Sequence, residues 1–258
     1  MKTLPDLSYG PRPHQALDMI LPCAPRAVVI YAHGGGFTKG SRKETTAVAL
    51  AAQLAPLGIA VVSVSYRLGG TLRDLDAGDR ARMRRMMAAS ARFGLRLHAR
   101  LYGPAFACAL LDLGQAVAAL RTGAVAPDVK GLPITILGMS AGGIAALSLA
   151  HPPRVWAGRL AQPDAVLAVS AAMVQPWCLR PGGPPCVMLH GPVDRIISPQ
   201  DARLAATTAQ DRRVDLLLIV TDTPGDVPQL TRLIHGTAPD GRPGLSLLTD
   251  LVARTGVC

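Results

Sequence analysis

The sequence predicts an α/β fold in which a mostly parallel sheet is covered by helices on both faces. Short continuous apolar runs alternate with stretches of helical pattern along the 258 residues. Continuous apolar strands separated by helices are typical of parallel sheets, because both faces of such a sheet are buried. The chain has no internal repeat and no low-complexity linker. We therefore expect a single domain over residues 1–258.

The predicted strands and helices follow one another in regular alternation. The strands are Ala27–His33, Ile59–Ser65, Ile134–Gly138, Ala165–Ser170, Cys186–His190 and Val214–Val220. The helices are Lys43–Ala55, Ala105–Thr122, Ala141–Ala150, Asp201–Gln210 and Leu245–Arg254. An earlier run, Gln15–Leu21, is expected to form an edge strand.

Residues 70–103 are predicted to form a helical insert. The apolar stripe consists of Met83, Met86, Met87, Phe93, Leu97 and Leu101, and a second face carries Arg80, Arg84, Arg92, Arg96 and Arg100. This spacing indicates one long amphipathic helix, or two shorter helices broken near Phe93-Gly94. One interpretation is a lid whose Met-rich face shapes an acyl or alcohol pocket. The other is a helix pair packed on the rim of the sheet.

The charge of the chain is unevenly distributed. The formal net charge is +10, and the segment from Thr71 to Gly103 holds eight arginines against three aspartates. Half of the excess positive charge therefore lies in the insert. No nucleic-acid-binding module is recognisable in the sequence. We expect no nucleic-acid partner, and we interpret the basic face as solvated, with an acidic partner or surface as the alternative.

The five cysteines are spread without C-x-x-C spacing, which argues against a zinc site. They predict five reduced thiols, with a Cys178–Cys186 bridge as the alternative in an oxidising compartment. No metal and no cofactor are expected. The N-terminus shows no apolar signal segment, and no apolar run predicts a membrane span. We expect a cytoplasmic protein, and a secreted form trimmed of its signal is the alternative.

Ser140 lies in the sequence Gly-Met-Ser-Ala-Gly, residues 138–142. This matches the G-x-S-x-G nucleophile elbow, a strained turn that lifts a serine hydroxyl above the C-terminal edge of a sheet. The motif requires a strand before it and a helix after it, and both are predicted here. A second motif, His-Gly-Gly-Gly-Phe at residues 33–37, follows a predicted strand. Such a loop turns backbone N–H groups toward the oxygen that becomes negative in acyl transfer. The pair of motifs predicts a serine hydrolase.

A serine nucleophile needs a base, and the base needs an acid that orients it. In folds with this elbow the chain order is Ser, then Asp or Glu, then His. Three histidines precede Ser140, one lies on the helix after it and one falls within a strand: His14, His33, His98, His151 and His190. His235 is therefore the predicted base.

The predicted acid is Asp194, which follows the strand Cys186–His190. Asp201 is better explained by the first turn of the next helix, where a carboxylate offsets the helix dipole. Asp222 and Asp226, in the loop that leads to His235, are the fallback acids.

These residues carry a family resemblance. The chain resembles the α/β-hydrolase fold, and within it the small carboxylesterases and lipases with an H-G-G-G loop. The likeness covers nearly the whole chain except the insert, through Tyr9-Gly10, residues 15–18, HGGGF, residues 61–68, GMSAGG at 138–143 and LHGPVD at 189–194. It implies that the backbone N–H groups of Gly35, Gly36 and Ala141 form the oxyanion hole, and that Tyr66-Arg67 is a structural turn.

The chain also departs from that family. Ser65 stands where such families often have Asp before the Tyr-Arg pair, and any lid must come from the 70–103 insert. We expect hydrolysis of small-molecule carboxylic esters through an acyl-Ser140 intermediate, with Phe37, Met139 and Trp177 contacting the substrate. The alternatives are an arylformamidase-like amide hydrolase and a catalytically silent α/β-hydrolase that binds a ligand or partner. The oligomeric state is left open.

Overall fold

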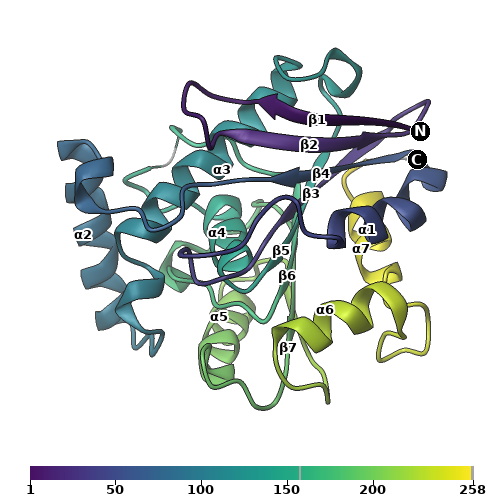
Figure 1. Cartoon of the computed structure of the whole chain (residues 1–258). Coiled ribbons are helices and arrows are strands. Elements are labelled where there is room, and N and C mark those ends of the chain that lie inside the picture. The colour runs from purple at the N-terminus through teal and green to yellow at the C-terminus, as the bar shows by residue number, and fades with distance from the viewer. Residues whose placement is uncertain (157, 257–258) are drawn as a thin grey trace.

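The centre of the molecule is an eight-stranded sheet with the order β1-β2-β4-β3-β5-β6-β7-β8 (Figure 1). The computed structural model describes residues 1–156 and 158–256. The strands are β1 (Lys2–Ser8), β2 (Ala16–Leu21), β3 (Ala27–Ala32), β4 (Ile59–Val64), β5 (Ile134–Met139), β6 (Ala165–Val169), β7 (Cys186–His190) and β8 (Leu216–Val220). Strands β3 to β8 are mutually parallel, whereas β1 and β2 form an antiparallel extension.

The six predicted core strands are all present, each within two residues of its expected bounds. The run Gln15–Leu21 forms β2, but it is not the edge, because β1 pairs outside it. Strand β1 lacks an apolar run and contains Pro5. A proline is tolerated on such an outer strand and at a break in the strand register, because it cannot donate to a neighbouring strand.

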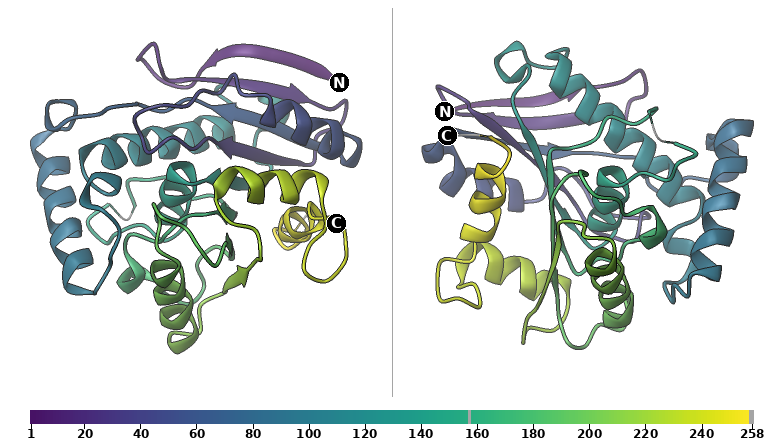
Figure 2. Two further views of the ribbon diagram at one scale, coloured as in Figure 1. Left: turned by 60° about the horizontal axis from the view of Figure 1, so that its bottom comes forward. Right: turned by 180° about the vertical axis from the view of Figure 1, so that it is seen from behind.

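Helices cover both faces of the sheet. One face carries α1 (Thr46–Leu54), α6 (Asp226–His235) and α7 (Ser246–Ala253), and the other carries α3 (Pro104–Thr122), α4 (Ala141–Ala150) and α5 (Pro199–Asp211) (Figure 2). Short 3₁₀ turns span Ala55–Leu57, Leu72–Asp74, Ala99–Leu101, Pro127–Val129 and Pro176–Cys178. The parallel strands are therefore buried on both sides, as their continuous apolar sequences require.

The core is built mainly from Ala, Val, Leu and Ile, in one cluster on each face of the sheet. The continuous helical stretch Ala99–Thr122 is long and apolar enough to cross a membrane by length and composition, but 67% of its most apolar window is buried inside the fold. We interpret it as a core helix, because α3 packs against α4. The four described cysteines are free thiols, whereas Cys258 lies outside the described residues.

The insert consists of α2 (Ala77–Arg92) and a following irregular segment. The helix ends at Arg92 with Phe93 as its C-cap, and Gly94 adopts a left-handed φ of +92°. Buried Met83 and Met86 pack into the cluster formed with α3. Helix α2 stands at one side of the molecule, beyond α3 and away from α6 and α7 (Figures 1 and 2).

Three polar contacts, two of them buried, hold the insert in place. The Asp79 carboxylate accepts a 2.9 Å hydrogen bond from Trp156 Nε1. Ser90 Oγ donates to the Val174 carbonyl oxygen at 3.0 Å. The Arg96 N–H donates at 2.8 Å to Oδ1 of Asp201, in the first turn of α5. These anchors favour a helix packed on the rim of the fold over a mobile cover.

Candidate active site

Ser140 stands on the turn between β5 and α4. Its backbone has φ +49° and ψ −115°, a conformation that is strained for any residue other than glycine. The Ser140 N–H donates a 2.8 Å hydrogen bond to the Val169 carbonyl oxygen at the end of β6. This contact fixes the turn at the C-terminal edge of the sheet and leaves the side chain half-buried.

The glycines around Ser140 are required by close approaches of the backbone. A Cβ atom at Gly142 would collide with the Ala32 carbonyl oxygen of β3. A Cβ atom at Gly138 would lie 2.6 Å from the Gly143 backbone. The G-x-S-x-G-G sequence therefore lets α4 begin directly against the sheet, which is the strand–turn–helix context that the motif predicts.

The glycine loop after β3 packs against this turn. Gly35 and Gly36 have φ values of +105° and +62°, which favour glycine. A Cβ atom at Gly34 would lie 2.8 Å from Met139 Cε, so the loop and the turn are in contact. Within the described residues, the N–H groups of Gly35, Gly36 and Ala141 have no hydrogen-bond acceptor. These are the three amides that the family resemblance assigns to an oxyanion hole.

A buried histidine and tyrosine support the glycine loop. The Tyr66 hydroxyl donates a 2.6 Å hydrogen bond to the His33 carbonyl oxygen, and the two rings stack with centroids 4.4 Å apart. His33 Nδ1 lies 2.8 Å from the Gly34 carbonyl oxygen. Burial lowers the pKa of His33. The ring is therefore a neutral structural group that orients the loop.

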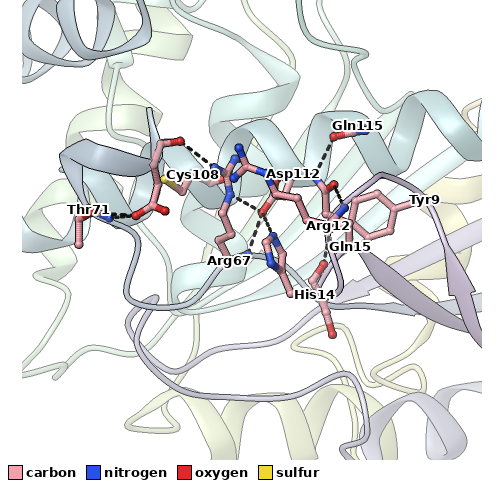
Figure 3. A network of polar contacts seen from close by, with 11 residues as sticks. Tyr9, Arg12, His14, Gln15, Arg67, Thr71, Cys108, Asp112 and Gln115 are labelled. Atoms are coloured by element: carbon pink, nitrogen blue, oxygen red, sulfur yellow. Dashed lines mark hydrogen bonds and ion pairs between the residues drawn. The ribbon is translucent and has the colours of Figure 1, made fainter. Parts of the chain in front are cut away.

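Asp112 of α3 binds Arg67 and thereby holds the Tyr66-Arg67 turn (Figure 3). This buried carboxylate accepts hydrogen bonds of 2.9 Å from the backbone N–H, Nε and Nη2 of Arg67, and another of 2.9 Å from Gln15 Nε2. Ser65, at the position where an Asp was expected, accepts a 2.9 Å hydrogen bond from Arg42 Nη1 instead. Tyr66-Arg67 is thus a structural turn, as the resemblance implied.

Ser140 opens into a pocket of about 660 Å³. The lining residues are Gly34, Gly35, Gly36, Thr38, Lys39, Gly40, Glu44, Arg100, Leu101, Met139, Ser140, Ile196, Asp226 and Val227. The insert contributes only its last residues, Arg100 and Leu101, and α2 does not reach the pocket. Among the described residues, no group of three or more His, Cys, Asp or Glu side chains could hold a metal ion.

Of the three residues predicted to contact substrate, only Met139 lines this pocket. Phe37 is fully buried and packs edge-on against Tyr66 and Phe106, so it belongs to the core. Trp177 lies 6.0 Å from the Phe93 ring, measured between centroids, and lines a separate pocket beside α2. Trp177 therefore packs beside the insert and does not line the Ser140 pocket.

Asp194 lies in the loop after β7, as its position in the chain predicts. Its Oδ1 accepts hydrogen bonds from the backbone N–H groups of Ile196 and Ile197, at 2.8 and 2.9 Å. The carboxylate therefore shapes the turn that presents Ile196 to the pocket. Asp201 lies in the first turn of α5, as expected.

His235 does not lie in the pocket. It is the exposed last residue of α6, and Asp226, the first residue of that ten-residue helix, lines the pocket. At 1.5 Å of rise per residue the two ends of α6 are about 13 Å apart. His235 is therefore at the end of the helix that is away from the residue lining the Ser140 pocket.

Helix α6 explains why the sequence placed His235 elsewhere. No helix is predicted from the sequence between residues 221 and 244, but Leu230, Leu233 and Ile234 form an apolar stripe at helical spacing that packs on the sheet. Gly225, at φ +79°, and Asp226 in the first turn mark the start of this helix. That stripe was the available signal, and it puts Asp226 at the site and His235 away from it.

Two contacts fix the beginning of α6 against the sheet. Gln229 Nε2 donates a 2.8 Å hydrogen bond to Ser170 Oγ at the end of β6. A Cβ atom at Gly191, after β7, would press on the Thr223 carbonyl oxygen. The loop from β8 to α6 is therefore packed directly beside the strand ends that border Ser140.

Both signs of charge are present in the pocket. Glu44 accepts hydrogen bonds from the Tyr31 hydroxyl at 3.1 Å and from the Ser41 N–H at 3.3 Å. Burial raises the pKa of Tyr31, and the nearby carboxylates of Glu44 and Asp226 raise it further. Lys39 and Arg100 add two exposed cations. The pocket can therefore receive a polar ligand of either charge at its mouth.

Comparison with known proteins identifies the fold. No protein-family model matches the chain, and no curated protein matches it. Among solved structures, a truncated carbohydrate esterase from gut microbiota matches with a TM-score of 0.65 at 13% identity, over 98% of this chain and 97% of that one. Esterase 2 of Thermogutta terrifontis phosphorylated by paraoxon matches with a TM-score of 0.68 at 16% identity, over 97% and 93%. The same esterase with bound propionate has a TM-score of 0.60 at 16% identity, over 94% and 90%.

These likenesses extend over nearly the whole of each chain, and at such identities they establish the fold. The molecule has the α/β-hydrolase fold that the motifs predicted. The chemistry at Ser140 has to be argued from its own residues.

Proposed function

We propose that the chain hydrolyses carboxylic esters slowly, through an acyl-Ser140 intermediate. The observation that carries this proposal is the positive φ of Ser140 beside three backbone amides that have no acceptor among the described residues. Such a conformation costs about 1–3 kcal/mol and persists where function uses it. The esterases of the same fold are consistent with this chemistry.

The reaction needs the serine hydroxyl and the amides first. Ser140 Oγ attacks the ester carbonyl carbon, and the carbonyl oxygen becomes an anion that Gly35, Gly36 and Ala141 can receive through their N–H groups. Each such donor is worth on the order of 10²–10³ in turnover. The alkoxide then leaves, and water cleaves the acyl-serine. The apolar side chains of Met139, Leu101, Ile196 and Val227 in the pocket fit a small acyl or alcohol group.

A ligand-binding protein without turnover is the second candidate. The observation that favours it is that no histidine is among the described residues lining the pocket. A serine hydroxyl is a poor nucleophile without a base. In this case the amides and Arg100 would hold a carboxylate or an ester that is never cleaved.

Hydrolysis of p-nitrophenyl esters of graded acyl length distinguishes the two candidates. We expect the wild type to exceed Ser140→Ala by at least about 100-fold on the best ester, since the oxyanion hole and binding alone leave only residual catalysis. The Ser140→Ala protein should keep the melting temperature of the wild type. Equal rates for both proteins, together with a rise in melting temperature when acetate or butyrate is added, would establish the binding protein instead.

A further inference from the structure

We propose that the Asp226 carboxylate is the general base for Ser140, in place of an imidazole. This inference rests on the ester hydrolysis proposed above. Asp226 is the titratable residue that the last loop, between β8 and α6, brings to the Ser140 pocket. That loop is where the Ser–acid–His order places the base. The role expected of His235 therefore passes to a residue nine positions earlier.

The contacts of Asp226 leave one of its oxygens available. The side chain is half-buried, and Oδ1 accepts a 2.8 Å hydrogen bond from the Val227 N–H. Within the described part of the chain, Oδ2 has no hydrogen-bond donor and no cation as a partner. Proton transfer needs an acceptor oxygen that the serine hydroxyl reaches directly or through one water. Asp226 Oδ2 is an available acceptor in the pocket that Ser140 also lines.

The other titratable groups of the pocket are less suited to the role. Both Glu44 oxygens already accept hydrogen bonds, from the Tyr31 hydroxyl and from the Ser41 N–H. Lys39 and Arg100 are exposed cations, and a solvated ammonium or guanidinium group donates protons rather than accepting them. The only described carboxylates lining the pocket are therefore Glu44, which is engaged, and Asp226, which is not.

The position of Asp226 is fixed by rigid surroundings. It begins a helix whose apolar stripe is buried, and Gln229 ties the first turn of that helix to Ser170. A base held on a packed helix keeps a constant direction toward its partner, which a base on a free loop does not. The same helix keeps His235 on the solvent side.

The proton balance of the reaction closes with this single carboxylate. In acylation, the Ser140 Oγ–carbon bond forms as the hydroxyl proton passes to Asp226, and the protonated Asp226 then returns that proton to the leaving alkoxide. In deacylation, a water molecule gives a proton to Asp226, and the oxygen of that water bonds to the acyl carbon. Ser140 Oγ leaves with the proton, and the carboxylate is restored.

A carboxylate base has a kinetic signature that an imidazole lacks. Aspartates in general titrate near pH 4 and histidines near pH 6.5. We therefore expect kcat/KM for a neutral ester to persist below pH 6 in the wild type. Glu44, Lys39 and Arg100 also line the pocket, and the buried Tyr31 hydroxyl donates a hydrogen bond to Glu44. The wild-type pH profile is therefore compared with the profile of each variant.

The test measures kcat, KM and the pH profile of p-nitrophenyl acetate hydrolysis for the wild type, Asp226→Asn, Asp226→His and Glu44→Gln. Asp222→Asn is the matched control, because Asp222 lies in the same loop but is exposed and paired with Arg232 outside the pocket. We expect Asp226→Asn to lower kcat by about 100-fold or more, in line with general-base contributions. Asp226→His should raise kcat at pH 7.5 and move the acidic limb of the profile toward pH 6.5.

Two results would overturn the inference in distinguishable ways. If wild-type hydrolysis depends on Ser140 while Asp226→Asn keeps its kcat, Asp226 is not the base, and a loss in Glu44→Gln would assign the role to Glu44. If the wild type shows no Ser140-dependent hydrolysis, the proposed function itself fails. The Asp226→Asn protein should keep the melting temperature of the wild type. The Asp222→Asn protein shows how much kcat falls when a carboxylate near the pocket is removed without any role as a base.

Discussion

The two sides of the Ser140 pocket differ in how completely they are built for acyl transfer. On one side, β5, α4 and the glycine loop provide a strained serine, three amides without an acceptor in the described part of the chain, and a packed support of His33 and Tyr66. On the other side, the loop from β8 to α6 provides Asp226 where an imidazole was expected. Under the proposed function, the oxyanion site and the proton-transfer group are separate parts of the site, and the same fold can hold one of them together with a different choice of the other.

The largest effect is expected where the elbow meets β3. Gly142→Ala places a methyl group against the Ala32 carbonyl oxygen, and rigid backbone surrounds it. We expect a loss of at least about 3 kcal/mol in the free energy of unfolding, because overpacking against backbone cannot be relieved by a side-chain rotation. Urea denaturation measures this.

Gly69→Ala is the control for that change. Gly69 has φ +64°, and a Cβ atom there meets nothing within 4 Å. The backbone penalty alone should cost about 1 kcal/mol. Equal losses for the two variants would mean that the elbow is not tightly packed against β3.

A pH-dependent effect of similar size is expected at the end of α4, the helix that leaves the elbow. Burial lowers the pKa of His151 to about 4. Between pH 4 and pH 6.5 the unfolded chain then binds more protons at this residue than the native protein does, so stability falls as the pH falls through this window. The contribution of neutral His151 to the free energy of unfolding is fully present above pH 6.5. By pH 4 the loss of this contribution amounts to roughly 3 kcal/mol.

His151→Gln removes the titrating group and tests this directly. The difference in unfolding free energy between wild type and variant, measured by urea denaturation at several pH values, should change steadily from pH 6.5 to pH 4. A constant difference over that range would show that His151 can be protonated without cost in the native state.

A smaller effect is expected at the mouth of the pocket. Arg100→Ala should raise KM several-fold for an ester with an anionic acyl group and leave KM for a neutral ester unchanged, because the exposed guanidinium acts only through its charge. High salt should reduce the difference, since exposed charges are screened beyond roughly 8 Å at physiological ionic strength. A similar rise for both esters would indicate a packing role.

The smallest effect is expected for His235, which lies at the opposite end of α6 from Asp226. His235→Ala should change kcat/KM by less than about twofold, as is usual for an exposed residue away from a site. Steady-state kinetics on a p-nitrophenyl ester measures it. A loss of 100-fold would mean that His235 reaches Ser140 in the working enzyme, and the comparison between the two sides of the pocket would then be wrong.

The sequence predicted the parallel strands and the elbow because their signals are local. The apolar runs, the glycines around Ser140 and the H-G-G-G loop each specify a backbone conformation within a few residues. The same is true of β7, whose bounds Cys186–His190 were predicted as the structure has them. These features need no knowledge of what packs against them.

The remaining site residues depend on tertiary placement. His235 was chosen by elimination along the chain, but its location follows from α6, whose apolar stripe was not recognised. Phe37 and Trp177 are large apolar side chains that could line a pocket or fill the core, and only packing decides between these roles. Strand β1 was missed because it is polar and pairs only on one side.

Intact-protein mass spectrometry after rapid mixing with p-nitrophenyl acetate tests the central claim most directly. The account predicts that a single acetyl group appears on the wild-type protein, maps to Ser140 after proteolysis, and is absent from Ser140→Ala. The adduct should form faster on Asp226→His than on the wild type, because the imidazole is the better base at neutral pH. An unmodified wild-type protein that turns the ester over no faster than Ser140→Ala, or an acetyl group found only on exposed lysines, would contradict it.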